Sequence, residues 1–175
     1  MKVLKIVLRI ATGAMVVQYA SLALAQTCVS GIQASNPTSV YFVNSVIGTV
    51  IDSRTGLMWD RCALGQSGPA CATGSASAIN WQSALDATAA LGTYKGYNDW
   101  RLPNYKELHS LIEECRVVAS INEFAFPNTP ALNFWSGSPS VSDVQSSWFI
   151  SFNDGSSYFA NRSNVGRVRL VRAGQ

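Results

Sequence analysis

Residues 99–108 read Asp99-Trp100-Arg101-Leu102-Pro103-Asn104-Tyr105-Lys106-Glu107-Leu108, and they combine a turn, a rigid proline and a helix start. Pro103 disfavours the α region for Leu102, so the chain is extended just before it. Asn104 is a good N-cap, and Glu107 stands three residues on, where its carboxylate can reach back to the N–H of the cap. A helix is therefore predicted to begin here. It buries the stripe Leu108, Leu111, Ile112 and Cys115.

Three further motifs accompany this stretch: Thr55-Gly56-Leu57-Met58-Trp59, Trp135-Ser136 and Arg169-Leu170-Val171-Arg172. Together they resemble the DUF1566 family, also called the Lcl C-terminal domain. The resemblance implies a variant of the C-type lectin fold, related to formylglycine-generating enzyme domains, in bacterial surface or secreted proteins. The residues that carry it are expected to be structural: Trp59, Asp99, Trp100, Arg101, Pro103 and Glu107.

The N-terminal segment has the pattern of a secretory signal peptide. A basic start with Lys2, Lys5 and Arg9 precedes the mostly apolar stretch 10–24, and Ala23-Leu24-Ala25 forms a small-x-small cleavage site. Residues 1–25 are therefore predicted to be removed, and residues 26–175 to form a single domain with its core at about 40–173. The alternative is an uncleaved anchor, but the apolar run is interrupted and short for a bilayer span. We expect a periplasmic, cell-surface or secreted protein, without a membrane span after cleavage.

The charge of the exported part is balanced. The chain has 13 basic and 10 acidic residues, and three of the basic ones lie in the first 25 residues, which leaves 10 of each sign. No global field therefore favours nucleic acid or anionic membranes. A local excess remains near the C-terminus, where guanidinium groups could meet sulfate or carboxylate; they could equally lie on the outward positions of an edge strand or form internal ion pairs. These residues are Arg162, Arg167, Arg169 and Arg172.

Four cysteines, an even number, follow the predicted export signal, which indicates two disulfides. We favour Cys62 with Cys71, because residues 63–70 are rich in Gly, Ser and Pro and can close a small loop. Cys28 is then left to pair with Cys115. A zinc site is disfavoured, since thiolate zinc sites show closely paired cysteines. Neither a metal nor a cofactor is expected.

The remaining patterns predict an α+β fold. Strands are expected at 40–43, 48–51 and 57–60, then at 147–152, 156–161 and 167–172, with a turn at 153–155. A first helix is expected from Trp81 to about Ala90, capped by Asn80. The result is two helices packed on one short, mostly antiparallel sheet, braced by disulfides, which agrees with the C-type lectin-like fold that the resemblance implies. Most of the five tryptophans are expected in its core.

No known catalytic constellation is present in the sequence. His109 is the sole histidine and lacks a nucleophile elbow, and Glu113 and Glu114, adjacent in the expected helix, point about 100° apart. The cysteine pair near the end of formylglycine-generating domains has no counterpart after Cys115. The order Asn98-Asp99-Trp100 also differs from the calcium-binding triplet of true C-type lectins. We predict that the protein is not an enzyme.

The favoured function is recognition of acidic or sulfated glycans, an adhesin-like role that rests on the resemblance. Aromatic, amide and guanidinium groups of the late strands and loops can stack on sugars and bind acidic groups. The alternative is a protein–protein assembly module of a pilus or envelope complex, and a homo-oligomer is compatible with either. The predicted ligand-binding residues are Trp135, Tyr158, Asn161, Arg162 and Arg167.

Overall fold

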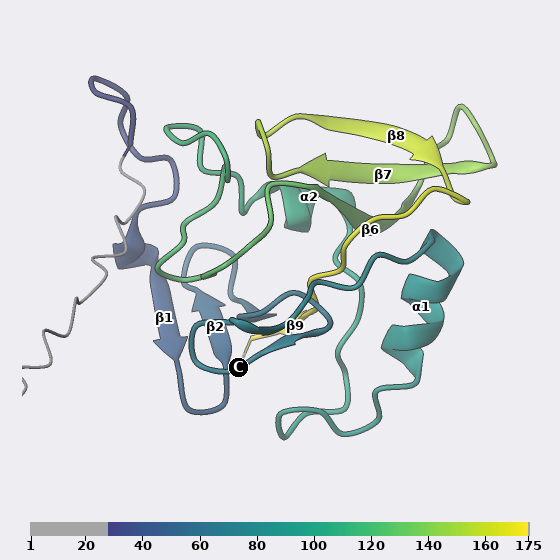
Figure 1. Ribbon diagram of the computed structural model, residues 1–175, viewed down its shortest axis with the longest axis horizontal. Coiled ribbons are helices and arrows are strands. Elements are labelled where there is room, and N and C mark those ends of the chain that lie inside the picture. The colour runs from purple at the N-terminus through teal and green to yellow at the C-terminus, as the bar shows by residue number, and fades with distance from the viewer. Residues whose placement is uncertain (1–27, 175) are drawn as a thin grey trace, which may run out of the picture.

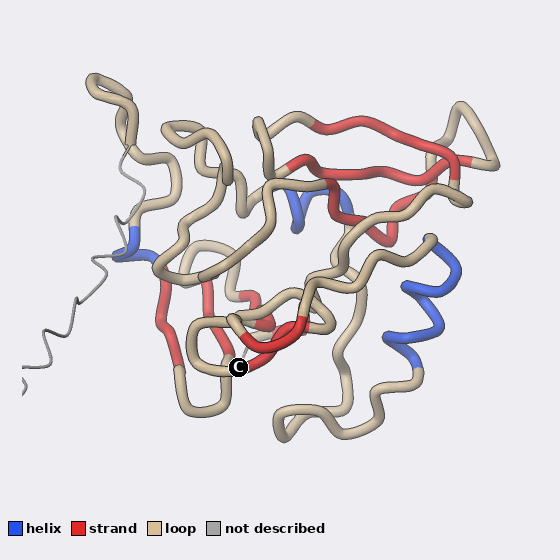
Figure 2. The backbone as a smooth tube through the Cα atoms, viewed as in Figure 1, coloured by secondary structure: helices blue, strands red, loops and turns tan. Residues whose placement is uncertain are grey.

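A computed structural model describes residues 28–174, in which two helices are set among short strands joined by long connections (Figures 1 and 2). The signal peptide expected at residues 1–25 lies outside the described residues. The elements are a 3₁₀ turn η1 (Thr38–Val40), β1 (Tyr41–Asn44), β2 (Thr49–Asp52), β3 (Leu57–Asp60), β4 (Gln66–Ser67), β5 (Thr73–Gly74), α1 (Trp81–Ala89), α2 (Tyr105–His109), β6 (Asn133–Pro139), β7 (Ser146–Ser151), β8 (Ser157–Asn161) and β9 (Val171–Ala173).

The first sheet joins the two ends of the fold. Its strands are antiparallel in the order β1-β2-β3-β9, so the last strand pairs with the third. Gly48 and Gly56 have positive φ at the two turns, a backbone conformation that glycine adopts at little cost. The predicted early strands are confirmed to within a residue. The predicted strand 167–172 is mostly wrong, because β9 begins only at Val171 and, of the four residues before it, only Arg167 forms an isolated bridge.

The second sheet is a separate antiparallel meander in the order β6-β7-β8. The predicted turn at 153–155 connects β7 to β8, with Gly155 at φ +79°. A third, two-stranded sheet, β4-β5, lies near the Cys62–Cys71 loop. The expectation of one sheet is therefore wrong, although the α+β class and the antiparallel pairing are confirmed. The two larger sheets stay separate because β6 meets the extended segment before β9, through a bridge between Phe134 and Arg167.

The helix starts follow their capping signals. The Asn80 side chain accepts the Ser83 N–H at the start of α1, and Asn104 and Glu107 form the predicted capping box at the start of α2. The α2 helix is shorter than expected and ends at His109. The rest of the predicted stripe, Leu111, Ile112 and Cys115, is buried but not helical.

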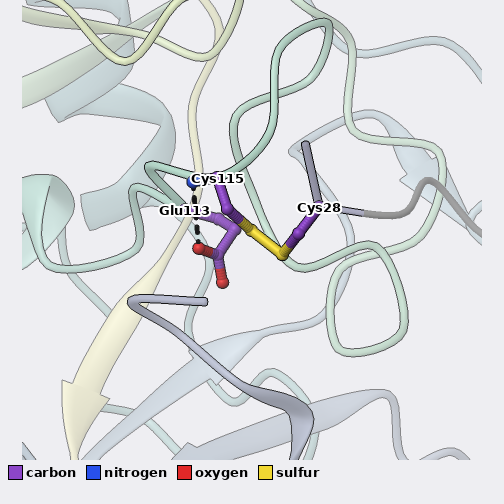
Figure 3. A group of neighbouring side chains, drawn as sticks. All are labelled: Cys28, Glu113 and Cys115. Carbon is purple, nitrogen blue, oxygen red and sulfur yellow. Dashed lines mark hydrogen bonds between the residues drawn. A yellow bond between two sulfur atoms is a disulfide. The ribbon is translucent and has the colours of Figure 1, made fainter. Parts of the chain in front are cut away.

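Glu113 explains why the helix ends early. Its N–H donates to the Ser120 carbonyl, and its fully buried carboxylate accepts the N–H groups of Ser35 and Asn36 at 2.8 and 2.9 Å. The same carboxylate accepts the Cys115 N–H, beside the disulfide to Cys28 (Figure 3). A continued helix could not offer this carboxylate to the N-terminal segment. The prediction that Glu113 and Glu114 are adjacent in a helix is wrong, because both lie beyond the end of α2.

Both predicted disulfides are present, Cys62–Cys71 and Cys28–Cys115, and the described residues contain no free cysteine. The core has two parts, one on each face of the first sheet. Trp59 belongs to one part, and Trp100 and Trp135 belong to the other. All three are buried, as expected of most of the five tryptophans, although Trp135 was also predicted to contact a ligand. Trp81 and Trp148 are half-buried.

The motif of residues 99–108, which starts α2, also takes part in two ion pairs. The Arg101 guanidinium donates to both carboxylate oxygens of Glu107 at 2.8 and 2.7 Å, and Asp99 accepts from Arg172 at 2.6 Å. The hydrogen bonds from Arg101, together with the Asn104 N–H and the Arg101 charge, hold the pKa of Glu107 below its usual value against the opposing effect of partial burial. The motif residues thus contact one another, as expected of structural residues.

Replacing Glu107 with glutamine is expected to lower the free energy of unfolding by about 0.5–1 kcal/mol at neutral pH, since an exposed ion pair and one cap bond are weakened. A carboxyl whose pKa is depressed in the folded state stabilises the protein above its unfolded pKa and loses this contribution as the pH falls through the folded pKa. Urea unfolding should therefore show the difference between parent and variant shrinking below about pH 4. The control is Glu114→Gln at an exposed site, and an equal effect there would contradict the assignment.

Candidate functional site

Trp135 is not available to a ligand. Its side chain is fully buried on β6, stacked on Phe149 with ring centroids 3.6 Å apart, and its Nε1–H donates to the Ile79 carbonyl at 3.0 Å. Gly166 packs against it so closely that a Cβ there would lie 3.0 Å from the indole ring. The expectation of an exposed Trp135 is wrong, because Trp135 and Phe149 are opposite residues of the neighbouring strands β6 and β7 and share the face of the sheet that packs on the core.

Tyr158 and Asn161 lie on opposite faces of β8, because their positions differ by an odd number of residues. Tyr158 is 40% exposed and packs on Phe149 at 5.9 Å. Partial burial, and then the nearby Asp154 charge, raise its pKa above the usual value. The Asn161 side-chain oxygen accepts from the N–H and the hydroxyl of Ser163 at 2.9 and 2.8 Å, so it shapes a turn.

Arg162 is half-buried and held by the fold. Its guanidinium lies over the Trp81 ring at 4.2 Å, and its Nε donates to the Ser147 hydroxyl at 2.9 Å. A cation over an indole ring is a stabilising contact, and here it joins α1 to the second sheet. Arg162 is therefore partly committed to structure, and a substitution there would change more than a surface charge.

The other arginines of the C-terminal cluster separate into buried and accessible ones. Arg169 is fully buried, with its guanidinium donating to the carbonyls of Asp60 and Arg61, and burial lowers its pKa to about 10. Arg172 is 4% exposed, pairs with Asp99 and lies 3.9 Å from the centre of the Tyr97 ring. The idea that these two point outward from an edge strand is wrong, and the alternative of internal ion pairing holds for Arg172.

Arg167 has the most accessible chemistry of the cluster. Its main chain is fixed to β6, since its N–H donates to the Asn133 carbonyl at 2.8 Å and its carbonyl accepts the Trp135 N–H at 2.9 Å. Its half-buried side chain lines a cavity of about 280 Å³. Within residues 28–174, its guanidinium makes neither a hydrogen bond nor an ion pair. The other lining residues are Gln66, Gly74, Ser75, Ala76, Asn128, Pro130 and Leu132.

The polar walls of this cavity are held in place by loop contacts. Gln66 Nε2 donates to the Asn128 carbonyl at 3.0 Å, and Asn128 Nδ2 donates to the Cys71 carbonyl at 2.9 Å. The Cys62–Cys71 disulfide therefore braces one wall. Sequence reasoning identified Arg167 but missed Gln66, the first residue of β4, and Asn128, in the connection before β6. Both are more than 35 residues away from Arg167, and no motif marks them.

A second feature that sequence reasoning missed is an aromatic row on the other face of the second sheet. Phe159 contacts Trp148 at 5.6 Å, and Trp148 contacts Tyr105 at 4.7 Å. Tyr105 in turn lies 5.7 Å from the exposed ring of His109. The turn at 153–155 sets the register that pairs Trp148 with Phe159, so the turn signal could have found this pair.

Cys28, Glu113 and Cys115 place their sulfur and carboxylate atoms within 4.8 Å of one another, which is close enough for a metal site (Figure 3). The two sulfurs are joined to each other, however, and the carboxylate already accepts hydrogen bonds from Ser35, Asn36 and Cys115. This arrangement is that of a structural latch for the N-terminal segment.

None of the helices among residues 28–174 is long and apolar enough to cross a membrane. The comparison with curated proteins finds no match. The family model of the Lcl C-terminal domain matches residues 48–172. This span leaves out β1 of the first sheet but includes β2, β3, most of β9, the whole second sheet, the two helices and the Arg167 cavity. The match covers well over half of the chain, which therefore belongs to the Lcl C-terminal domain family.

Proposed function

We propose that this protein is a non-enzymatic recognition domain that binds acidic or sulfated glycans. The observation that carries the proposal is the Arg167 guanidinium, which lines a cavity and has no partner among the described side chains. A guanidinium presents a planar fork of donors that matches carboxylate and sulfate oxygens. Its main-chain anchoring to Asn133 and Trp135 fixes the base of this side chain before a ligand arrives.

The cavity walls suit one unit of a sugar chain. Its volume of about 280 Å³ lies just below the usual range of small-molecule pockets, roughly 300–1,000 Å³. Gln66, Ser75 and Asn128 offer polar groups for sugar hydroxyls, while Leu132, 43% exposed, offers apolar surface for the C–H face of a ring.

We further infer that the domain is a variant of the C-type lectin fold and acts outside the cytoplasm. The two disulfides indicate an oxidising compartment, which supports export by the predicted signal peptide to the periplasm, the cell surface or the medium. The large share of loop structure between short strands, visible in Figure 2, supports the lectin-like variant.

The test is binding of Arg167→Gln to a glycan array that includes heparin fragments, run at two salt concentrations. Loss of charge-assisted hydrogen bonds should weaken binding by at least tenfold, equivalent to about 1.5–3 kcal/mol. The free energy of unfolding should change by less than about 0.5 kcal/mol, because the side chain has no internal partner to lose.

The matched control is Lys106→Gln, which removes one exposed positive charge on α2 and should bind as the parent does. Binding of the parent to acidic glycans should also weaken at higher salt. A parent that binds no acidic glycan, or an Arg167→Gln variant that binds as tightly as the parent, would refute the proposal.

The alternative role as an assembly module is favoured by exposed apolar side chains around the second sheet. Val141 and Val144, in the connection from β6 to β7, are 102% and 77% exposed, and Phe159 on β8 is 46% exposed. Exposed apolar side chains that cluster on a protein surface are typical of sites that contact another protein.

A further inference from the structure

Strand β8 lies at the edge of the second sheet and pairs only with β7. Figure 1 shows it at the upper margin of the molecule, with β7 on its inner side. In an antiparallel pair, successive residues alternate between bonding to the neighbour and pointing away from it. The bonds from Arg162 N–H to the Gln145 carbonyl and from Ser151 N–H to the Ser156 carbonyl fix this alternation at both ends of the strand.

The alternation directs the main-chain groups of Ser157, Phe159 and Asn161 away from β7. Within residues 28–174, the Asn161 carbonyl accepts the Asn164 N–H, and the other outward groups of these three residues have no main-chain partner. An outer row of unpaired N–H and C=O groups is a template for another extended strand. The C=O and N–H groups that match these outward groups would be supplied by the backbone of a second β-strand.

The edge strands of the two larger sheets are β1, β9, β6 and β8, and the first three are more protected than β8. On β9, Val171 forms a bridge with Arg101 on its outer side. On β6 the segment at Arg167 bonds to the outer side, the register shifts between Trp135 and Pro139, and the strand ends in proline. On β1 the Tyr41 N–H is already bonded to the Thr38 carbonyl. The sequence of β8, Ser157-Tyr158-Phe159-Ala160-Asn161, contains no charge and no proline, and its register with β7 is regular over five pairs. Charged residues, proline and an irregular register usually protect an edge strand from pairing, and β8 has none of these three.

We propose that β8 pairs with β8 of a second copy of this chain, antiparallel and across a two-fold axis at Phe159, to form one continuous six-stranded sheet. In this register Phe159 faces Phe159 of the partner, and Ser157 faces Asn161 of the partner. The unbonded outward groups then form about four main-chain hydrogen bonds, and the Asn161 carbonyl of each copy, which already accepts the Asn164 N–H, has a second lone pair for one more. The contact is self-complementary, as a two-fold interface requires. The inference does not depend on glycan binding.

The side chains of β8 are compatible with pairing to β8 of a second copy. Phe159, 46% exposed, lies at the end of the aromatic row with Trp148 and Tyr105, and in the dimer it meets its own copy, so that the two rows become one. No like charges meet along the uncharged strands.

The test is sedimentation of the purified protein over a dilution series without ligand. A single strand pair is a small interface, so we expect a mass twice that of the chain at high concentration, falling to the monomer on dilution. Phe159→Lys places two like charges at the axis and should remain monomeric at every concentration. Phe42→Lys is the matched control. Phe42 is an exposed phenylalanine of β1, an edge strand of the first sheet with the similar sequence Tyr41-Phe42-Val43-Asn44.

A second variant tests the register without disturbing the sheet. Phe159→Cys should form a disulfide-linked dimer on mild oxidation, because directly opposed residues of an antiparallel pair lie within disulfide range, whereas Phe42→Cys should not. Several outcomes overturn the proposal: a parent that stays monomeric throughout, a Phe159→Lys variant that still dimerises, or a Phe159→Cys variant that does not cross-link. Loss of the dimer in both Phe159→Lys and Phe42→Lys would also overturn it, in favour of a head-to-tail contact between β8 and β1.

Discussion

Replacing Trp100 with alanine is expected to destabilise the folded protein by about 3–5 kcal/mol. The indole is 6% exposed and belongs to the core part that lies between the first sheet and α1, where it meets the rings of Tyr94 and Tyr97 at 6.2 and 6.3 Å. Its Nε1–H donates to the Tyr94 carbonyl at 2.8 Å. The substitution therefore removes a large buried volume and leaves an acceptor without its donor.

The measurement is urea unfolding of the parent, Trp100→Ala and Trp100→Phe. The phenylalanine variant keeps most of the packing and loses the hydrogen bond, so its cost should be smaller, about 1–2 kcal/mol. Because a domain of this size is stable by only about 5–15 kcal/mol, the alanine variant should unfold at a much lower urea concentration. An alanine variant as stable as the parent would mean that Trp100 has no structural role.

The parts of the fold that could be predicted from the sequence are those fixed by neighbouring residues. The capping box of Asn104 and Glu107, the cap at Asn80 and the turn at 153–155 all depend on contacts within a few positions, and all are present. The early strands follow from their turns in the same way. Local chemistry was sufficient in each case because the partners are close in the chain.

The parts that could not be predicted depend on partners distant in sequence. The stripe after Leu108 has helical spacing, but Glu113 is held by Ser35 and Asn36, about 77 residues away, and this contact ends the helix. Two arginines near the C-terminus are buried because their guanidinium groups find acceptors at Asp60, Arg61 and Asp99. Residue type and period carry no information about such partners.

The candidate site shows the same division. Arginine chemistry pointed to Arg167, but the cavity wall comes from loops around Gln66 and Asn128, which only the folded chain brings beside it. Trp135 was expected to face a ligand, and its pairing with Phe149 in the second sheet buries it instead. An aromatic residue in a strand can face either side, and the register that decides this was not evident from the sequence.

Removing the Cys28–Cys115 disulfide is expected to destabilise the fold about as much as Trp100→Ala does, and more than removing the other disulfide. The bridge joins residues 87 positions apart, whereas Cys62 and Cys71 are 9 apart. In the chain-entropy model, constraining the unfolded chain over these separations stabilises the fold by about 4.5 and about 2.5 kcal/mol, respectively. The double variant Cys28→Ala with Cys115→Ala should therefore be destabilised about 2 kcal/mol more than Cys62→Ala with Cys71→Ala.

The comparison is well matched, because both pairs are replaced by alanine and three of the four cysteines are buried. The Cys28 bridge also ties the N-terminal segment to the Glu113 latch, where the Val29 N–H donates to the Cys115 carbonyl at 2.8 Å (Figure 3). These hydrogen bonds can form without the bridge, so the folded state should keep its arrangement and the loss should arise in the unfolded chain. Urea unfolding of both double variants measures the difference, and mass spectrometry of non-reduced peptides verifies the two linkages in the parent. If the variant without the short bridge proves the less stable of the two, loop entropy does not control the stability of this fold, and local contacts around Cys62 and Cys71 must.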